Sequence, residues 1–129
     1  MTSLGIEIKS ITCIMVLLES ADALKSEFKI DLQDPYDSES VKHFYDGVKS
    51  WIDSHDPNCV IIKKRLEKGK FAGGASSFKI EGLIQLASSV PVKLVGGPEL
   101  NRLAKKVEAM PKMKKYQEQA YLAALSALE

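Results

Sequence analysis

The sequence contains few of the residues that build common catalytic and metal centres. Its 129 residues include two cysteines and two histidines. Cys13 and Cys59 lie within apolar stretches, where a free thiol behaves as a small hydrophobe, so we expect reduced core residues and not a disulfide or a metal pair. His43 and His55 have no serine or cysteine at the spacing of a known catalytic motif, and we expect them at the surface. The composition therefore does not favour a zinc centre or a histidine-based catalytic site.

Long hydrophobic runs and a secretory leader are also lacking. The longest apolar run, Ile11–Leu18, is far shorter than the roughly 20 residues of a membrane-spanning helix. No basic leader precedes the first apolar stretch. We therefore expect a cytoplasmic protein that has no membrane partner. With 45% hydrophobic and 27% charged residues, the chain has the composition of one globular domain. We place that domain at residues 1–127 and interpret residues 128–129 as the remnant of an expression tag.

Charge is abundant but unevenly distributed along the chain. The net charge is +1, yet residues 19–56 carry ten acidic and four basic side chains, whereas residues 57–129 carry thirteen basic and six acidic ones. A chain with an acidic and a basic half can present a basic face to phosphate groups. The alternative is that the lysines only keep the helix surfaces hydrated.

The basic half contains the stretch around which the chain is organised, residues 58–86. The apolar residues Cys59–Ile62 predict a buried strand, and an amphipathic helix follows, capped by Ser76 or Ser77, with Phe78 expected in the core. Between strand and helix lies a loop that is rich in lysine and glycine. Its candidates for contact with the phosphates of a nucleic acid are Lys63, Lys64, Arg65, Lys68, Lys70, Gly73 and Gly74. A solvated surface loop is the alternative interpretation.

The hydrophobic pattern predicts the order β-β-β-α-β-α-β-α, with the last helical region interrupted at Pro111. The strands are predicted at Leu4–Ile8, Ile11–Leu18, Glu27–Leu32, Cys59–Ile62 and Pro91–Val95, and the helices at 38–54, from Ser76 or Ser77 onward, at 100–107 and at 116–127. A three-stranded meander followed by alternating strands and helices predicts an α/β fold with a five-stranded mixed sheet and flanking helices.

The last predicted helix is rich in alanine. Its small residues Ala120, Ala123, Ala124 and Ala127 let a neighbouring element approach closely. We expect that neighbour to be the sheet of the same chain, with the partner of a homodimer as the alternative.

The order of elements resembles that of the ribonuclease H-like fold. The opening Gly5-Ile6-Glu7 stands where RuvC-type resolvases and their relatives carry a glycine, an apolar residue and an acid on the first strand. The stretch KGKFAGG, together with the helix after it, resembles a small family of uncharacterised bacterial proteins classed as a domain of unknown function. The resemblance covers essentially the whole chain and implies a ribonuclease H-like fold.

The resemblance also implies a candidate catalytic site. Nucleases of this superfamily hold two divalent ions, Mg²⁺ or Mn²⁺, about 4 Å apart with carboxylates from the first strand, the fourth strand and the last helix. Glu7 matches the first position, and Glu118 is the candidate on the last helix, although Gln119 could equally face the site. Glu67, in the basic loop, is the nearest carboxylate to the fourth strand. The resemblance thus implies Glu7 and Glu118 as metal ligands and Glu67 as a third catalytic residue.

The fourth strand departs from this pattern, because Lys64 stands where relatives often carry an acid. An ammonium group there would repel a divalent cation and could pair with Glu7. A shift of one residue in the strand register would turn Lys63 inward in place of Lys64.

Three functional hypotheses follow. The first is a RuvC-like protein with a degenerate catalytic site that binds DNA or RNA through residues 63–79. The second is a nuclease that depends on Mg²⁺ or Mn²⁺. The third is a protein-interaction module in which the acidic helix 38–54 or the basic loop docks a partner.

Overall fold

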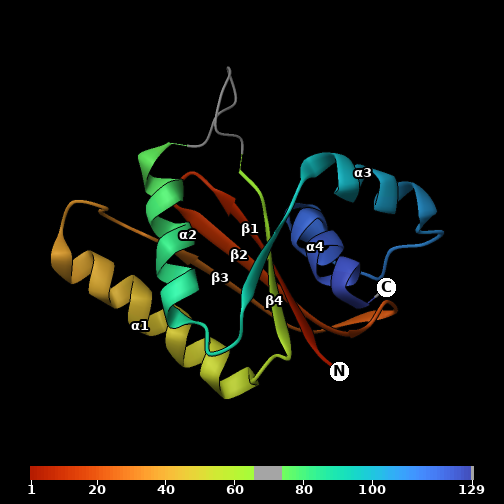
Figure 1. The fold of residues 1–129 in the computed structure, drawn as a ribbon, viewed down its shortest axis with the longest axis horizontal. Coiled ribbons are helices and arrows are strands. Elements are labelled where there is room, and N and C mark those ends of the chain that lie inside the picture. Colours follow the sequence, from red (N-terminus) through yellow and green to blue (C-terminus); the bar gives the residue numbers. More distant parts are fainter. Residues whose placement is uncertain (66–73, 129) are drawn as a thin grey trace.

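The computed structural model, which describes residues 1–65 and 74–128, has three layers, with a sheet between two pairs of helices (Figure 1). The strands are β1 (Ser3–Lys9), β2 (Thr12–Ser20), β3 (Ala23–Asp31), β4 (Cys59–Lys63) and β5 (Val92–Val95), and the helices are α1 (Ser38–His55), α2 (Ala75–Ala87), α3 (Gly97–Lys106) and α4 (Glu118–Leu128), with a 3₁₀ turn, η1 (Lys115–Gln117), before α4. Among these residues, no helix is both long enough and apolar enough to cross a membrane.

The five strands form one mixed sheet in the order β3-β2-β1-β4-β5. The first three strands pair antiparallel as a meander, and β4 and β5 run parallel to β1. This arrangement confirms the predicted five-stranded mixed sheet. Because β1, β4 and β5 are parallel, their carboxyl ends meet at one edge of the sheet, which is where ligands bind in open α/β folds.

Each face of the sheet carries its own core. Successive residues of a strand point to opposite faces, so Leu4 and Ile6 of β1 pack under α1 and α2, with Phe44 and Ile84 among their neighbours in that core. The core on the other face lies under α3 and α4 and includes Ile14, Val16, Ile61, Leu100 and Tyr121. Each fully buried side chain of this size contributes about 1.5–3 kcal/mol.

Gly5 sets how closely α4 approaches the sheet. A Cβ atom at Gly5 would overlap the Ala120 carbonyl oxygen and the Ala124 amide nitrogen and would lie 2.8 Å from the Ala124 Cβ. The alanine face of α4 therefore packs on the sheet of its own chain, as predicted. The Ser3 hydroxyl adds a hydrogen bond of 2.8 Å to the Ala124 carbonyl oxygen.

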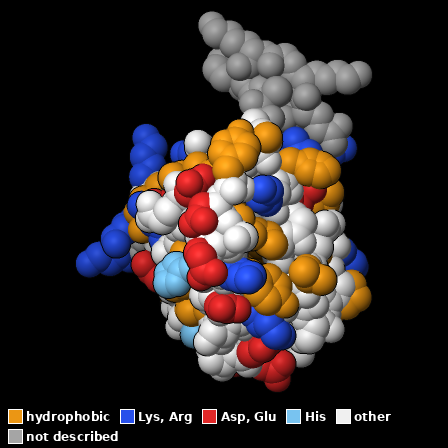
Figure 2. Space-filling view, turned by 90° about the vertical axis from the view of Figure 1, so that its left-hand side faces the viewer, with side chains coloured by type: hydrophobic (Ala, Val, Ile, Leu, Met, Phe, Trp, Pro, Cys, Tyr) orange, Lys and Arg blue, Asp and Glu red, His pale blue; other side chains and the backbone are white. Residues whose placement is uncertain are grey.

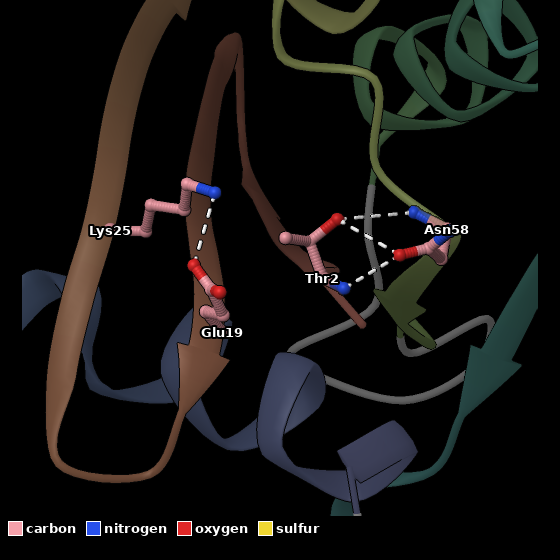
Figure 3. Close-up of polar contacts among 4 residues, drawn as sticks. All are labelled: Thr2, Glu19, Lys25 and Asn58. Atoms are coloured by element: carbon pink, nitrogen blue, oxygen red, sulfur yellow. Dashed lines mark hydrogen bonds and ion pairs between the residues drawn. The ribbon is translucent and has the colours of Figure 1, made fainter.

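Polar contacts fix the opposite edge of the sheet, where β1 and β4 begin. The Thr2 backbone N–H donates to the Asn58 side-chain oxygen at 2.7 Å, and the Asn58 N–H donates to the Thr2 carbonyl oxygen at 3.0 Å. Figure 3 shows this pair beside the ion pair between Lys25 and Glu19, which joins β3 to β2 at 3.1 Å. The parallel register of β1 and β4 is thus held from its first residues.

Three local predictions were wrong in detail. Strand β3 begins at Ala23 and not at Glu27, because the sheet pairing continues to the turn after Ser20. Helix α2 begins after Gly74, which has no side-chain cap, and the Ser77 hydroxyl instead donates to the Gly74 carbonyl oxygen. Phe78 is 55% exposed and does not belong to the core, because it lies on the helix face opposite Ile80.

Candidate functional site

A cleft of about 700 Å³ opens at the carboxyl ends of β1 and β4. It is lined by the end of β1 with the following turn, the end of β4, and the first residues of α2 and α3: Glu7, Ile8, Lys9, Ser10, Lys63, Lys64, Arg65, Gly74, Ser76, Ser77, Gly97, Pro98 and Asn101. Helices α2 and α3 lie on opposite faces of the sheet and begin at the same edge (Figure 1). The cleft therefore has the position at which open α/β sheets bind ligands.

Glu7 and Lys63 form an ion pair in this cleft. Ile6 pairs with Ile62 in the parallel ladder, which sets the residues that follow them side by side. The Lys63 Nζ lies 3.5 Å from the Glu7 Oε2, and the two side chains are 29% and 10% exposed, respectively. The carboxylate is thus nearly buried, while the ammonium group keeps access to the cleft.

The sequence left open whether Lys63 or Lys64 faces Glu7, and the structure shows the Lys63 arrangement. Lys63 faces Glu7, whereas Lys64 is exposed. The Lys64 backbone N–H donates to the Val95 carbonyl oxygen at 2.7 Å, which extends the pairing of β4 with β5 by one residue. Both lysines still line the cleft, so both stay candidates for phosphate contact.

The cleft is positively charged. In the described part of the chain, the residues that line it include Lys9, Lys63, Lys64 and Arg65 and a single carboxylate, Glu7. The N-terminal ends of α2 and α3 add to this potential, since neither helix has a side-chain cap at its first residue. Free backbone N–H groups at a helix N-terminus attract anions. The arrangement suits a phosphate group better than a cation.

The Arg65 side chain extends from the cleft toward α2. Its guanidinium carbon lies 4.5 Å above the centre of the Phe78 ring, and its Nε lies 3.9 Å from the Glu81 carboxylate. The Nε has no hydrogen-bond partner among the described residues. Arg65 thus borders both the cleft and the outer surface of α2, of which Phe78 is a part.

The predicted carboxylate cluster does not assemble among the described residues. Glu118 is the first residue of α4, is half-buried and does not line the cleft. In residues 1–65 and 74–128, no group of three or more histidine, cysteine, aspartate or glutamate side chains lies close enough to hold a metal ion. With an ammonium group 3.5 Å from Glu7, the described residues do not fit the two divalent ions that the fold implies. Glu67, Lys68, Lys70 and Gly73 lie outside the described residues.

Gln117 is the buried polar residue at the start of the last helix, and the sequence did not single it out. It is 2% exposed, and its side-chain oxygen accepts a hydrogen bond of 2.9 Å from the Lys114 N–H. Gln117 lies three residues before Ala120, so the two share a helix face, whereas Glu118 and Gln119 point elsewhere. The contact of Gly5 with Ala120 determines which side of the last helix faces the sheet, and this contact is visible only in the folded structure.

A family model described as "Protein of unknown function (DUF3010)" matches residues 1–127. No curated protein matches. Among solved structures, RuvC from Thermus thermophilus is similar at 16% identity, with a TM-score of 0.74 and coverage of 98% of this chain and 92% of RuvC.

Two further structures have related folds. T. thermophilus RuvC in complex with a Holliday junction substrate is similar at 16% identity, with a TM-score of 0.76 and coverage of 98% of this chain and 91% of RuvC. A ROK family transcriptional regulator, a homologue of the E. coli MLC protein, is similar at 12% identity, with a TM-score of 0.54 over 81% of this chain and 30% of the regulator. These likenesses confirm the predicted ribonuclease H-like, RuvC-like fold.

Proposed function

The chain belongs to DUF3010, a family of proteins of unknown function, and from the cleft itself we propose that this protein binds DNA or RNA there without cleaving it. The observation that carries the proposal is that, among the described residues, four basic side chains and one carboxylate line the cleft at the carboxyl edge of the sheet. Phosphate contacts by lysine and arginine supply most of the affinity of proteins that bind nucleic acid without sequence preference.

Two further features support the same proposal. The N-termini of α2 and α3 lie at the cleft and have no side-chain cap, and helix N-termini favour the binding of phosphate. The similar RuvC structure contains a Holliday junction substrate. A four-way DNA junction is therefore the first ligand to test, followed by duplex and single-stranded DNA and RNA.

The site favours binding over hydrolysis. Two-metal hydrolysis of a phosphodiester needs carboxylates that hold two cations and orient the attacking water. Among the described residues, Glu7 is the one carboxylate that lines the cleft, and Lys63 already neutralises it. The described residues of the cleft can thus hold a backbone phosphate but do not supply the ligands of two metal ions.

Fluorescence anisotropy of labelled junctions tests the proposal. We expect saturable binding that weakens steeply with salt, and a loss of at least about tenfold in affinity for the double charge reversal Lys9→Glu, Lys64→Glu, with a smaller salt dependence. The matched control is Lys42→Glu, an exposed lysine of α1 that does not line the cleft. Equal losses for control and cleft variants would refute a site in the cleft, and no binding at low salt would refute the proposal.

The strands recovered from the same mixtures decide between a binder and a nuclease. With Mg²⁺ or Mn²⁺ present, we expect intact strands. Cuts that disappear in Glu7→Gln would show that the protein is a metal-dependent nuclease after all.

A second candidate function, self-association, is supported by the outer face of α2. Phe78 and Leu86 are 55% and 71% exposed, and no atom lies within 4 Å of a Cβ built on Gly82, which stands between them. Figure 2 shows exposed hydrophobic side chains among charged ones on the face that carries α1 and α2. Large hydrophobic side chains that are exposed in a row mark contact surfaces more often than isolated ones do.

The spacing of this stripe suits a second copy of the same chain. Phe78 and Leu86 lie four residues on either side of Gly82, so a twofold axis at Gly82 sets Phe78 of one antiparallel helix against Leu86 of the other. Lys79 would then lie opposite the neutral Gln85, and its own Nζ already donates to the Pro35 carbonyl oxygen. With Tyr36, whose ring centre lies 6.0 Å from that Nζ, the stripe offers roughly 400 Å² per copy, about half of a standard interface.

Sedimentation or light scattering over a range of concentrations tests this dimer. We expect the mass to rise above the 14.2 kDa of one chain with concentration, and Phe78→Ser combined with Leu86→Ser to abolish the rise. Leu94→Ser is the control, because Leu94 is an exposed hydrophobe on β5. A monomer at all concentrations would contradict the proposal.

A further inference from the structure

We infer that the Lys63 ammonium group takes the place of a divalent cation in this cleft, so that a backbone phosphate is held by a fixed side-chain charge and binding needs no metal. The inference rests on the proposed function, since it names the group that meets the phosphate. It departs from what the fold implies, because the described residues do not fit a metal pair.

The Lys63 ammonium group is paired with Glu7 on one side and is accessible from the cleft on the other. Its Nζ lies 3.5 Å from the Glu7 Oε2, and the Glu7 side chain is only 10% exposed. The nearly buried carboxylate therefore fixes the position of the ammonium group. An ammonium group has three N–H donors, and Glu7 is its one salt-bridge partner among the described residues. The Lys63 side chain is 29% exposed at the cleft, which leaves donors free for a phosphate oxygen.

The pair also explains why the nearly buried carboxylate does not repel an anion. Glu7 lies in the same cleft as the proposed phosphate site, and an unpaired carboxylate at that place would oppose a phosphate. Lys63 neutralises Glu7, and Lys9 and Lys64 supply further positive charge, whereas Arg65 also faces the Glu81 carboxylate. Removal of the Lys63 charge would leave an unpaired carboxylate facing the ligand, and its repulsion of the phosphate would weaken binding.

We expect the substitution Lys63→Glu to make phosphate binding in the cleft depend on a divalent cation. It sets a second carboxylate beside Glu7 on the neighbouring strand, and strands lie about 4.8 Å apart. Mg²⁺ in nucleotide and nucleic-acid sites is commonly held by one or two carboxylates together with a phosphate of the substrate. The variant would thus carry a minimal ligand set that the described residues of the unaltered protein do not form.

Anisotropy of a labelled four-way junction, with EDTA and with Mn²⁺, tests the exchange. We expect the unaltered protein to bind equally in both conditions. We expect Lys63→Glu to lose at least about tenfold in affinity in EDTA and to regain most of it with Mn²⁺. Lys63→Gln and Lys64→Glu are the controls, because neither builds a carboxylate pair with Glu7, and both should lose affinity without recovery by Mn²⁺.

A thermal melt without nucleic acid gives a second readout. Mn²⁺ should raise the melting temperature of Lys63→Glu and leave that of the unaltered protein and of Lys63→Gln unchanged, since a ligand stabilises only the state that binds it. Binding by the unaltered protein that requires Mn²⁺, or a Lys63→Glu variant that Mn²⁺ does not rescue, would overturn the inference while the proposed binding function stands. A junction that the unaltered protein does not bind in either condition would overturn the proposed function and the inference with it.

Discussion

The substitution Gly5→Ala tests the close packing of α4 on β1, on which the position of the cleft residue Glu7 depends. The new methyl carbon would lie 2.8 Å from the Ala124 Cβ and would overlap two backbone atoms of α4, the Ala120 carbonyl oxygen and the Ala124 nitrogen. Favourable contact between carbon atoms begins at about 3.5 Å. Helix α4 must therefore move away from the sheet, because backbone atoms cannot change rotamer as a side chain can.

The expected cost follows from this overlap. Overpacking of a core costs about 1–3 kcal/mol and occasionally more, and contact with backbone atoms on two turns of α4 puts Gly5→Ala at the upper end, about 3 kcal/mol. For a chain of this length, that corresponds to a fall in melting temperature of roughly 10 °C. The loss is a large part of the 5–15 kcal/mol that stabilises a typical domain.

Thermal and urea unfolding followed by circular dichroism measure the effect. Two other glycines provide controls. A Cβ at Gly47 meets only the flexible end of Ile30, at 2.7 Å, and a Cβ at Gly82 in α2 meets nothing within 4 Å. We expect a small loss for Gly47→Ala and a gain of about 0.5–1 kcal/mol for Gly82→Ala. A Gly5→Ala variant as stable as Gly47→Ala would refute the described packing of α4.

Two further predictions concern the helix cap and the thiols. The Asp37 side chain accepts a hydrogen bond of 3.2 Å from the Ser40 N–H at the start of α1, so Asp37→Ala should lower the free energy of unfolding by about 1 kcal/mol in urea titrations. Burial raises the pKa of the Cys13 thiol, whereas Cys59 is half-buried; we expect a thiol reagent to modify one cysteine, Cys59, in the native protein and both in urea. Rapid modification of Cys13 without denaturant would contradict the buried position.

The order of the elements was predictable because each strand and helix has its own local pattern. The alternation in β3 and the helical spacing in α1 are visible in single segments, and the N-cap at Asp37 follows from its residue type. Phe78 was also predictable in principle, because it lies on the opposite side of α2 from Ile80 and Ile84.

The sequence could not show that Lys63, and not Lys64, faces Glu7, because the choice depends on the register between β1 and β4. Val60, Ile61 and Ile62 are all buried, since β4 is covered on both faces, so no alternation shows which side chain faces α4. The pairing of Ile6 with Ile62 decides the matter and sets Lys63 beside Glu7.

The sequence pattern of the last helix did not identify Gln117 as its inward polar residue, for a similar reason. The sequence offered Glu118 and Gln119, but the packing of Ala120 on Gly5 turns the face of Gln117 inward. The phase of a helix relative to a sheet is a tertiary property, and an alanine-rich helix has a weak pattern from which to predict it.

The most direct test of the central claim is a titration of the ¹⁵N-labelled protein with a four-way DNA junction, followed by the backbone amide resonances. The account predicts that the largest shifts fall at the cleft, at Ser10, Lys64, Ser76 and Gly97, with those of the outer face of α1 unchanged. Shifts confined to α1 or to the Phe78 and Leu86 side of α2, or no shifts at low salt, would contradict a nucleic-acid site in the cleft.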